Sequence, residues 1–518
     1  MTFIFGLKIA FKFIINPAVI GDYHQNKIRN IMNFIRPKIS SLVVLFFLNS
    51  LALATPINYQ DTYPSLTLGT TVVGLELITE LNPTAYGQAF ANGTESIKNS
   101  NGDFIAFDRI SNIYRVAQDG DQELLLDTKQ LIGSSFINNG SQLGLQYAVP
   151  HPEFAVNSTS GSGKIYTTTT ESINPDKTAS FFALPTGIPV ASHHYDVVSE
   201  WDLTGPTPIR NILMVMETPY NDHNARWLGF DADENLYISV GDGGNTFRSA
   251  GDTVAEHGFS QRENSPLGSI LRVALDGNGG YTIPSDNPYV NEPNTLSEIY
   301  ANGLRNPQQC WWDKSDELFC ADIGQRLAEE VNHIVAGGNY GWTVREGKYC
   351  VVSSDEDLAK LCVPDSAYTD PLYAYAHVDN SFGLENRAIG GLAVCEDCGI
   401  WELDGFFINV DLAVGTLMAF NPNTQELNEL LFKDLQTAAI STYAELAGLS
   451  RVEARLGSCG DIFICLTSRK DDQIFRLTSV VSVNSPSSLG FLISSLLFLA
   501  WRSSRLTSHA NKNHMQPR

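Results

Sequence analysis

Short stretches of β-forming residues recur along the chain, and each follows a polar turn that contains Gly or Asp. They read GDFIAFDRISNIYRV (102–116), GKIYTTTTE (163–171), ENLYISVGDG (234–243), DELFCADIG (316–324), DGFFINVDLAVGTLMAF (404–420) and GDIFICLTSRKDDQIFRL (460–477). Alternating or continuous apolar runs of this length are typical of strands, and no long helical period appears between the two ends of the chain. The pattern therefore predicts an all-β protein.

The spacing of these stretches favours one architecture. They follow one another at intervals of about 55 to 90 residues, which is enough for a small antiparallel sheet with loops of uneven length. Repeated sheets arranged around a central channel protect their edge strands. We therefore expect a six-bladed β-propeller of four-stranded antiparallel blades. The alternatives are a large β-sandwich and several small β domains.

The N-terminal segment has the pattern of an export signal. From Met32, a basic start leads into an apolar run that ends in Ala52-Leu53-Ala54 before Thr55. This order of features is typical of a secretory signal with a small-residue cleavage site. We therefore expect residues 1–54 to be an extension plus signal peptide, with translation starting at Met32. A membrane anchor is the alternative, although the run is short for a membrane span.

The C-terminal segment, 481–518, contains a second short apolar run, Leu489–Trp501, followed by Arg502 and Arg505. It resembles a bacterial sorting tail of the PEP-CTERM type, although Asn-Ser-Pro stands where that family has Pro-Glu-Pro. A tail-anchoring helix is the alternative, so we expect possible attachment to a membrane here. These boundaries leave 55–480 for the propeller domain.

Charge and cysteine content narrow the classes of function. The chain has 57 acidic and 34 basic residues and a formal net charge of −23. No basic stripe is available for a phosphate backbone, so we expect no nucleic-acid partner. The eight cysteines fall between Cys310 and Cys465, and an even number in an exported chain suggests disulfides. Their spacings invite four local pairs but do not determine them: Cys310–Cys320, Cys350–Cys362, Cys395–Cys398 and Cys459–Cys465. A four-cysteine metal site is the less favoured alternative.

Four motifs together resemble a known family. They are DHNARWLGFDADENLYISVGDGG, LGSILRVALDG, EIYANGLRNPQQ and EEVNHIVAGGNYGW. In this combination they resemble the PQQ-dependent glucose/sorbosone dehydrogenases, to which the hedgehog-interacting proteins are related. The resemblance covers about residues 70–478. It implies a six-bladed propeller that binds pyrroloquinoline quinone (PQQ) and calcium and oxidises a sugar.

The resemblance also implies roles for individual residues. The catalytic residues would be His223, Asp242 and Arg305. The cofactor-binding residues would be Gln142, Asn306, Arg451 and Arg455. The calcium ligands would be Ile323, Gly324, Gln325 and Glu329, with Glu330 adjacent.

The chemistry of these residue types agrees with the implied roles. Oxidation of an alcohol removes a hydroxyl proton while a hydride leaves the carbon, and a neutral imidazole suits the first task. A carboxylate from Asp242 would fix the tautomer of His223, while PQQ accepts the hydride. The alternatives are a surface histidine, an Asp242 that only makes an Asx-turn and an Arg305 that only satisfies loop carbonyls.

Two departures from the family pattern bear on these roles. Ala225 and Arg226 follow the histidine where the family often has small glycines, and Ala413 falls where some members have a cofactor-binding lysine. PQQ carries three carboxylates, so a lost cation weakens its binding.

The leading hypothesis is an exported sugar dehydrogenase that passes electrons to an external acceptor, either a quinone or a small carrier protein. The alternatives are a non-catalytic propeller that binds carbohydrate or protein at the cell surface and, ranked last, a calcium-dependent lactonase.

Overall fold

The computed structural model describes residues 67–480 except for a set of internal segments. Those segments are 85–88, 140–141, 173–178, 185–193, 245–257, 326, 351–359, 362–365, 378–386, 414, 434–439, 443–453, 461–462 and 469–471. The chain divides into two compact units, Met1–Ile57 and Asn58–Arg518, and all described residues belong to the second. The predicted signal segment 1–54 and the tail 481–518 therefore lie outside the described residues, as does Arg451.

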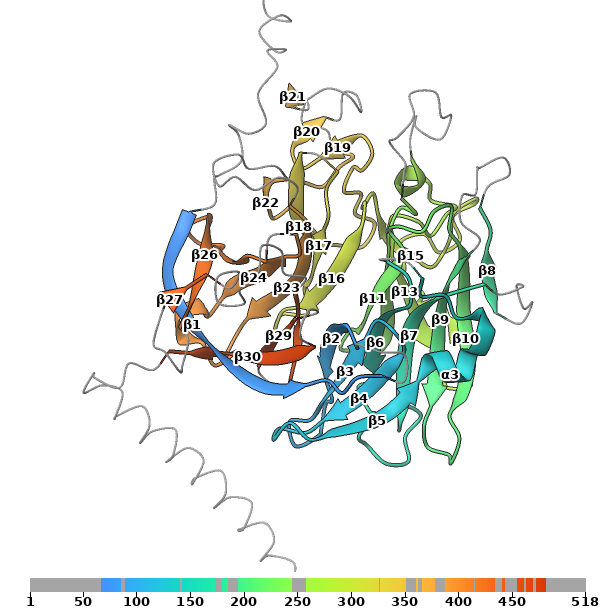
Figure 1. Cartoon of the computed structure of the whole chain (residues 1–518). Coiled ribbons are helices and arrows are strands. Elements are labelled where there is room, and N and C mark those ends of the chain that lie inside the picture. The colour runs from blue at the N-terminus through green and yellow to red at the C-terminus, as the bar shows by residue number, and fades with distance from the viewer. Residues whose placement is uncertain are drawn as a thin grey trace, which may run out of the picture. The chain divides into compact units, whose positions relative to one another are not determined.

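The regular secondary structure of the described residues is almost entirely strand, and the strands form sheets in chain order (Figure 1). The first sheet contains β2 (Ala91–Ser96), β3 (Phe104–Asp108), β4 (Asn112–Val116) and β5 (Gln122–Asp127). The second contains β6 (Leu145–Pro150), β7 (Lys164–Glu171), β9 (Tyr195–Asp202), β10 (Ile209–Glu217) and β8 (Ser180–Phe182). The third contains β11 (Ala225–Phe230), β12 (Asn235–Val240), β13 (Ser269–Leu275), β14 (Tyr281–Thr282) and β15 (Ile299–Asn302).

The second half of the chain continues the pattern. The fourth sheet contains β16 (Pro307–Trp312), β17 (Leu318–Asp322), β18 (Ala328–Ile334) and β22 (Tyr373–Ala376), and a small sheet contains β19 (Arg345–Glu346), β20 (Tyr349–Cys350) and β21 (Lys360–Leu361). A larger sheet has the order β23 (Ile389–Cys395), β24 (Phe406–Asp411), β25 (Leu417–Asn421), β26 (Glu426–Lys433), β1 (Thr67–Glu80), β30 (Gln473–Ser479), β29 (Ile464–Ser468) and β28 (Ala454–Ser458), with β27 (Ile440–Ser441) beside β26. Helical segments are short: α3 (Thr128–Ile132), η3 (Gly133–Ser135), η4 (Phe259–Gln261) and η6 (Trp401–Leu403).

Six strands contact one another in a closed ring: one from each of the first four sheets and the two end strands of the larger sheet. β2 contacts β6, β6 contacts β11, and the series continues through β16, β23 and β28 back to β2. The third sheet is covered on both faces, because every residue of its strands β11 and β12 is buried. Sheets that are apolar on both faces must be covered by neighbouring sheets, and a radial arrangement does this. The prediction of an all-β propeller is confirmed.

The N-terminal strand β1 closes the ring (Figure 1). It runs antiparallel to β30, with Val73 opposite Ser479, and parallel to β26, with Val73 opposite Phe432. Val73 is fully buried in the core cluster that β24, β26, β28 and β29 share. One strand from the start of the domain thereby joins two sheets from its end.

Disulfides form between cysteines that are close in the sequence. Cys310 bonds Cys320, Cys395 bonds Cys398 and Cys459 bonds Cys465, as predicted. Cys350 is also disulfide-bonded, whereas its predicted partner Cys362 lies outside the described residues. These bonds exclude the alternative of a four-cysteine metal site for the described cysteines.

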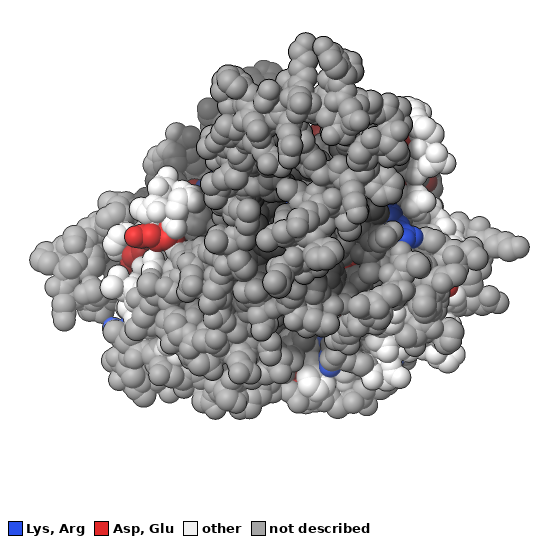
Figure 2. Space-filling view, turned by 90° about the horizontal axis from the view of Figure 1, so that it is seen from above, with Lys and Arg blue, Asp and Glu red and all other residues white. Residues whose placement is uncertain are grey.

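Two surface features of the described part of the chain bear on its partners. No helix there is long and apolar enough to span a membrane. Figure 2 shows acidic and basic side chains of the described residues in small separate groups on the face seen from above.

We predict that β1 is essential for closure of the ring. Val73→Asp places a carboxylate in the core and is expected to lower the free energy of unfolding by about 3 kcal/mol or more. Leu77→Asp in the same strand is the matched control, because Leu77 is 53% exposed. Chemical denaturation of both variants measures the difference, and equal midpoints would contradict the role of β1.

Candidate active site

His223 and Asp242 form a hydrogen-bonded pair at one end of the strand ring. His223 precedes β11, and Asp242 follows β12 in the same sheet. The Nδ1 of His223 lies 2.6 Å from Oδ1 of Asp242, which is fully buried. Since a carboxylate can only accept, Nδ1 carries the proton and Nε2 presents its lone pair. The arrangement predicted for a general base and its orienting carboxylate is thus present.

The carboxylate of Asp242 is held by further donors. Its Oδ2 accepts a hydrogen bond of 2.7 Å from Nε1 of Trp342, and its Oδ1 accepts one of 2.9 Å from the amide of Gly244. The backbone amide of Asp242 donates to the carbonyl of Arg305 at 2.8 Å. Asp242 therefore fixes the positions of groups from three separate chain segments.

The glycines around Asp242 allow this close approach. A Cβ on Gly241 would lie 2.3 Å from the carbonyl oxygen of His223, so only glycine fits there. Gly243 has a φ of 76°, which favours glycine, and its amide donates to that carbonyl. His223 itself has a φ of 54°, an uncommon conformation for a residue with a side chain. The GDGG motif is therefore required by the packing of the histidine loop against the end of β12.

Gln142 and Asp196 hold the histidine loop in place by hydrogen bonds to its backbone and to Asn224. The side-chain oxygen of Gln142 accepts the amide of His223 at 3.2 Å, and its carbonyl accepts Nδ2 of Asn224 at 2.6 Å. The carboxyl of Asp196 accepts the amide of Ala225 at 2.6 Å, and its burial raises the pKa of Asp196 to about 8. Gln142 lies beside His223 as predicted, although its contacts position the loop and its role in cofactor binding stays a prediction.

The Arg305 guanidinium is surrounded by oxygen atoms. Its Nη1 donates to the carbonyls of Ile323 at 2.9 Å and Gly324 at 2.8 Å, and its Nη2 donates to Oε1 of Gln325. The guanidinium also lies over the Trp342 ring, 5.4 Å from the ring centre. Three predicted calcium ligands therefore converge on one cation, so this oxygen set fits a hard cation such as calcium.

The fourth predicted ligand, Glu329, does not belong to this set. Its Oε1 bonds Nδ1 of His377, and its Oε2 accepts the amide of Ile389 at 2.8 Å. Successive side chains of a strand point to opposite faces of the sheet, so Glu330 lies on the face of β18 opposite to Glu329. Glu330 lines a small cavity together with Arg305, Ile323 and Gly324. The carboxylate that lines this cavity is therefore that of Glu330, which also accepts hydrogen bonds from Gly347 and Asn332, and the role of Glu329 as a calcium ligand stays a prediction.

Other carboxyl groups lie at this cavity. Asp322 accepts the amides of Arg305 at 2.9 Å and Asn306 at 2.6 Å. Burial raises the pKa of Asp322 to about 7 and that of Glu330 to about 8. Glu346 also lines the cavity, and its Oε1 accepts the amides of Gln325 and two nearby residues. Such a set of buried acids next to one guanidinium is typical of a functional site.

Asn306 and Arg455 belong to a polar layer inside the ring. Oδ1 of Asn306 accepts Nε2 of Gln308 at 2.8 Å, and Oε1 of Gln308 accepts Nη1 of Arg455 at 3.0 Å. Arg226 joins the same layer, because it donates to Gln146 at 3.3 Å and to Asn92 at 3.2 Å. Arg226 therefore points along the inner strands rather than over His223.

The position of the missing lysine has another cation nearby. The amide of Ala413 donates to Asp411, and Asp411 accepts the hydroxyl of Tyr375 at 3.3 Å. The buried guanidinium of Arg387 stacks on the Tyr375 ring at 5.6 Å. A buried positive charge thus lies near Ala413, on a side chain that the sequence motifs did not indicate.

The sequence analysis assigned no role to Trp342 and Asp322, which lie at the site, or to His377, which pairs with Glu329. The motif GGNYGW contributes only to the family resemblance in the sequence, yet Trp342 contacts both Asp242 and Arg305. Asp322 ends a strand in DELFCADIG, where a polar residue after an apolar run is a usable signal. His377 has no local signal, because its importance depends on pairing with Glu329 from another strand.

Comparison with known proteins agrees with this geometry. A family model described as glucose/sorbosone dehydrogenase matches residues 97–426. The HIPL2 protein of Arabidopsis thaliana is 36% identical over 194 residues, which are 35% of this chain and 27% of that protein. Quinoprotein glucose dehydrogenase B of Acinetobacter calcoaceticus is 34% identical over 129 residues, which are 23% of this chain and 26% of that protein. The chain therefore spans only about a quarter of the length of each of these relatives.

The fold is also similar to a solved structure. The PQQ-bound aldose sugar dehydrogenase of Streptomyces coelicolor superposes with a TM-score of 0.50 at 20% identity, over 79% of this chain and 98% of that one. At this identity the similarity concerns the fold alone. The match of the family model, by contrast, covers more than half of the sequence. This chain belongs to the glucose/sorbosone dehydrogenase family.

Proposed function

We propose that this protein oxidises an aldose or a related sugar to its lactone or acid, using PQQ and calcium. The observation that carries the proposal is the His223–Asp242 pair beside Arg305 at one end of the strand ring. The family membership supports oxidation of sugars, and the quinoprotein relative supports the choice of cofactor.

We also propose that the ring consists of six blades of four strands, the second of which carries β8 as an additional edge strand. In this interpretation β23–β26 form the fifth blade, and β28–β30 with β1 form the sixth. The parallel pairing of β1 with β26 is what merges these two blades into one larger sheet. The closed series of first strands supports the count.

In the proposed reaction His223 accepts the proton of the sugar hydroxyl. Nε2 is the accepting atom, because Nδ1 is committed to Asp242. The buried carboxylate stabilises the imidazolium that forms, and Trp342 keeps that carboxylate oriented. Bound PQQ would accept the hydride that leaves the carbon carrying that hydroxyl.

The residues that would hold the cofactors follow from the oxygen set. Calcium would take the carbonyls of Ile323 and Gly324 with the carboxylate of Glu330, while Asn306, Arg387 and Arg455 supply polar and positive groups in the channel. Calcium and the guanidinium of Arg305 compete for the same carbonyl oxygens. With calcium on these carbonyls, the Nη groups of Arg305 would be available to an anionic group of PQQ.

An extracytoplasmic location fits the disulfides, which persist in oxidising compartments. We propose export to the periplasm, the cell surface or the medium, with possible attachment to a membrane through the tail. Electrons would then leave through a quinone or a small carrier protein.

A second candidate is a non-catalytic propeller that binds carbohydrate or protein. Two observations favour it: Ala413 replaces a cation, and the donors of Arg305 are occupied by loop oxygens. PQQ titration separates the two candidates, because the binding module needs no quinone.

The dehydrogenase proposal predicts turnover after reconstitution. Purified protein with PQQ and calcium should reduce a dye acceptor in the presence of an aldose. Asp242→Asn should retain PQQ binding but lower kcat by about 100-fold or more, because the tautomer of His223 is no longer fixed. Absence of turnover together with absence of PQQ binding would refute the proposal and leave the binding module.

Adjacent glutamates provide a matched test of the calcium assignment. Glu330→Gln should lower the affinity for calcium about tenfold, since a charged ligand is lost. The loss is measured as a smaller rise in Tm on addition of calcium. Glu329→Gln should leave that affinity unchanged, although it will lower stability through its contacts with His377. The assignment fails if calcium affinity follows Glu329 instead.

A further inference from the structure

A cleft lies at the end of the strand ring opposite His223. Its volume is about 450 Å³. His223 and Arg305 precede β11 and β16, whereas the cleft is lined by the last residues of these strands and by the turns that follow them. The same holds for β2, β6, β23 and β28, so the two sites are at opposite mouths of one ring.

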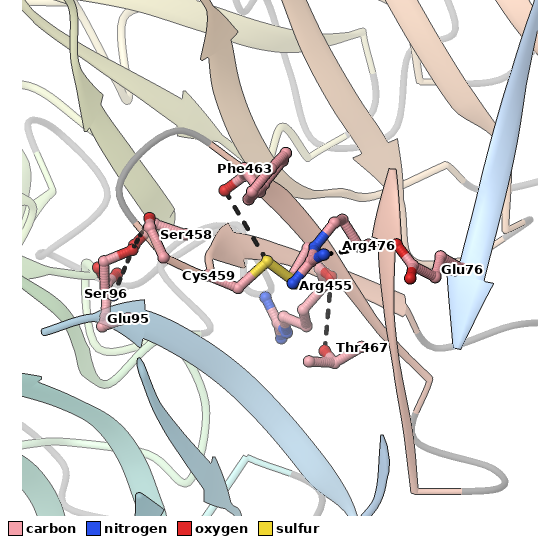
Figure 3. The surroundings of a disulfide bond; sticks show 11 residues. Glu76, Glu95, Ser96, Arg455, Ser458, Cys459, Phe463, Thr467 and Arg476 are labelled. Atoms are coloured by element: carbon pink, nitrogen blue, oxygen red, sulfur yellow. Dashed lines mark hydrogen bonds and ion pairs between the residues drawn. A yellow bond between two sulfur atoms is a disulfide. The ribbon is translucent and has the colours of Figure 1, made fainter. Parts of the chain in front are cut away.

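Aromatic side chains form much of the cleft wall. Trp311 and Trp312 come from the end of β16, and Phe463 comes from the turn between β28 and β29. The ring of Trp312 is fixed by an edge-to-face contact with Tyr237, with the ring centres 5.0 Å apart. Phe463 is fixed by Arg476, whose guanidinium lies 4.4 Å from the ring centre (Figure 3). These rings are partly exposed to the cleft while their positions are set by neighbours.

A carboxyl group from β2 lies at the base of the cleft. Glu95 accepts the hydroxyl of Tyr147 from β6 and the hydroxyl of Ser458 from β28, the latter at 3.0 Å (Figure 3). Ser458 in turn accepts the amide of Ser96 at 2.8 Å. Groups from three sheets therefore meet here, and burial raises the pKa of Glu95 to about 7.

Three disulfides lie at or beside this mouth. Cys310–Cys320 joins the end of β16 to β17, Cys395–Cys398 follows β23, and Cys459–Cys465 encloses the turn that carries Phe463. Cys310 and Cys398 line the cleft directly. Bonds that close loops of ten, three and six residues constrain the unfolded chain little compared with long loops. Their main consequence is to fix the local geometry of the cleft wall.

Polar groups of both charges complete the lining. Acceptors come from Asp231, Asp313 and Glu396, and donors come from Lys98 and His151. A sugar ring offers apolar C–H faces that pack on aromatic rings, together with hydroxyls that both donate and accept. A purely cationic ligand would not use Lys98, and a phosphate ligand would meet several carboxylates. We propose that this cleft is a second binding site, for a neutral oligosaccharide.

Titration calorimetry on the cofactor-free full chain tests the proposal. The probes are linear glucose trisaccharides with α-1,4, β-1,4 and β-1,3 linkages, and tetramethylammonium as the cationic probe. At least one trisaccharide should bind. Phe463→Ala and Glu95→Gln should each weaken that binding by about tenfold or more, because the first removes an aromatic ring from the wall and the second replaces an acceptor oxygen at the base by an N–H donor.

Two further variants serve as controls. Trp401→Ala removes a tryptophan that is 78% exposed and is not part of the lining, and His223→Ala alters the other mouth. Both should leave trisaccharide binding unchanged. Glu95→Gln preserves side-chain size and keeps the test valid if Phe463→Ala fails to fold. The proposal is overturned if no trisaccharide binds, if binding ignores Phe463 and Glu95, or if only tetramethylammonium binds.

Discussion

The site depends on one buried carboxylate, that of Asp242. It receives Nδ1 of His223, the indole N–H of Trp342 and the amide of Gly244, while its own amide bonds the carbonyl of Arg305. A buried charge without such partners would cost several kcal/mol. Loss of one of these contacts therefore also destabilises the positions of the other groups. They join the histidine loop of the third sheet to the arginine that begins the fourth. The proposed chemistry therefore requires the closed ring, because neither sheet alone places both groups at one mouth.

The sequence predicted the repeated sheets well because each strand is a local pattern. It did not predict how the ring closes. Val73 pairs with Ser479 and Phe432, and nothing near Val73 in the chain indicates partners so far away. Register and closure are properties of the assembled domain, since pairing is set by burial of both faces.

The sequence indicated the contact between His223 and Asp242 because a motif fixes the backbone there, but it did not indicate contacts that depend on which face of a strand a side chain occupies. GDGG requires glycines for the approach of His223, and this constraint is visible in the sequence. Glu329 and Glu330 are adjacent and identical in chemistry, so only the register of β18 separates a partner of His377 from a group beside Arg305. No role for Trp342 was predicted, because its indole N–H bonds Asp242, which is 100 residues away in the sequence. The aromatic cleft was missed because Trp311 and Trp312 look like ordinary strand residues.

The most direct measurement of the central claim is a single-turnover experiment on protein loaded with PQQ and calcium. The absorption of bound quinone is followed after rapid mixing with an oxidisable aldose, in the unmodified protein and in His223→Gln. The account predicts that both proteins bind the quinone and that only the unmodified protein reduces it rapidly. Equal reduction rates in the two proteins would contradict the assignment of His223 as the base.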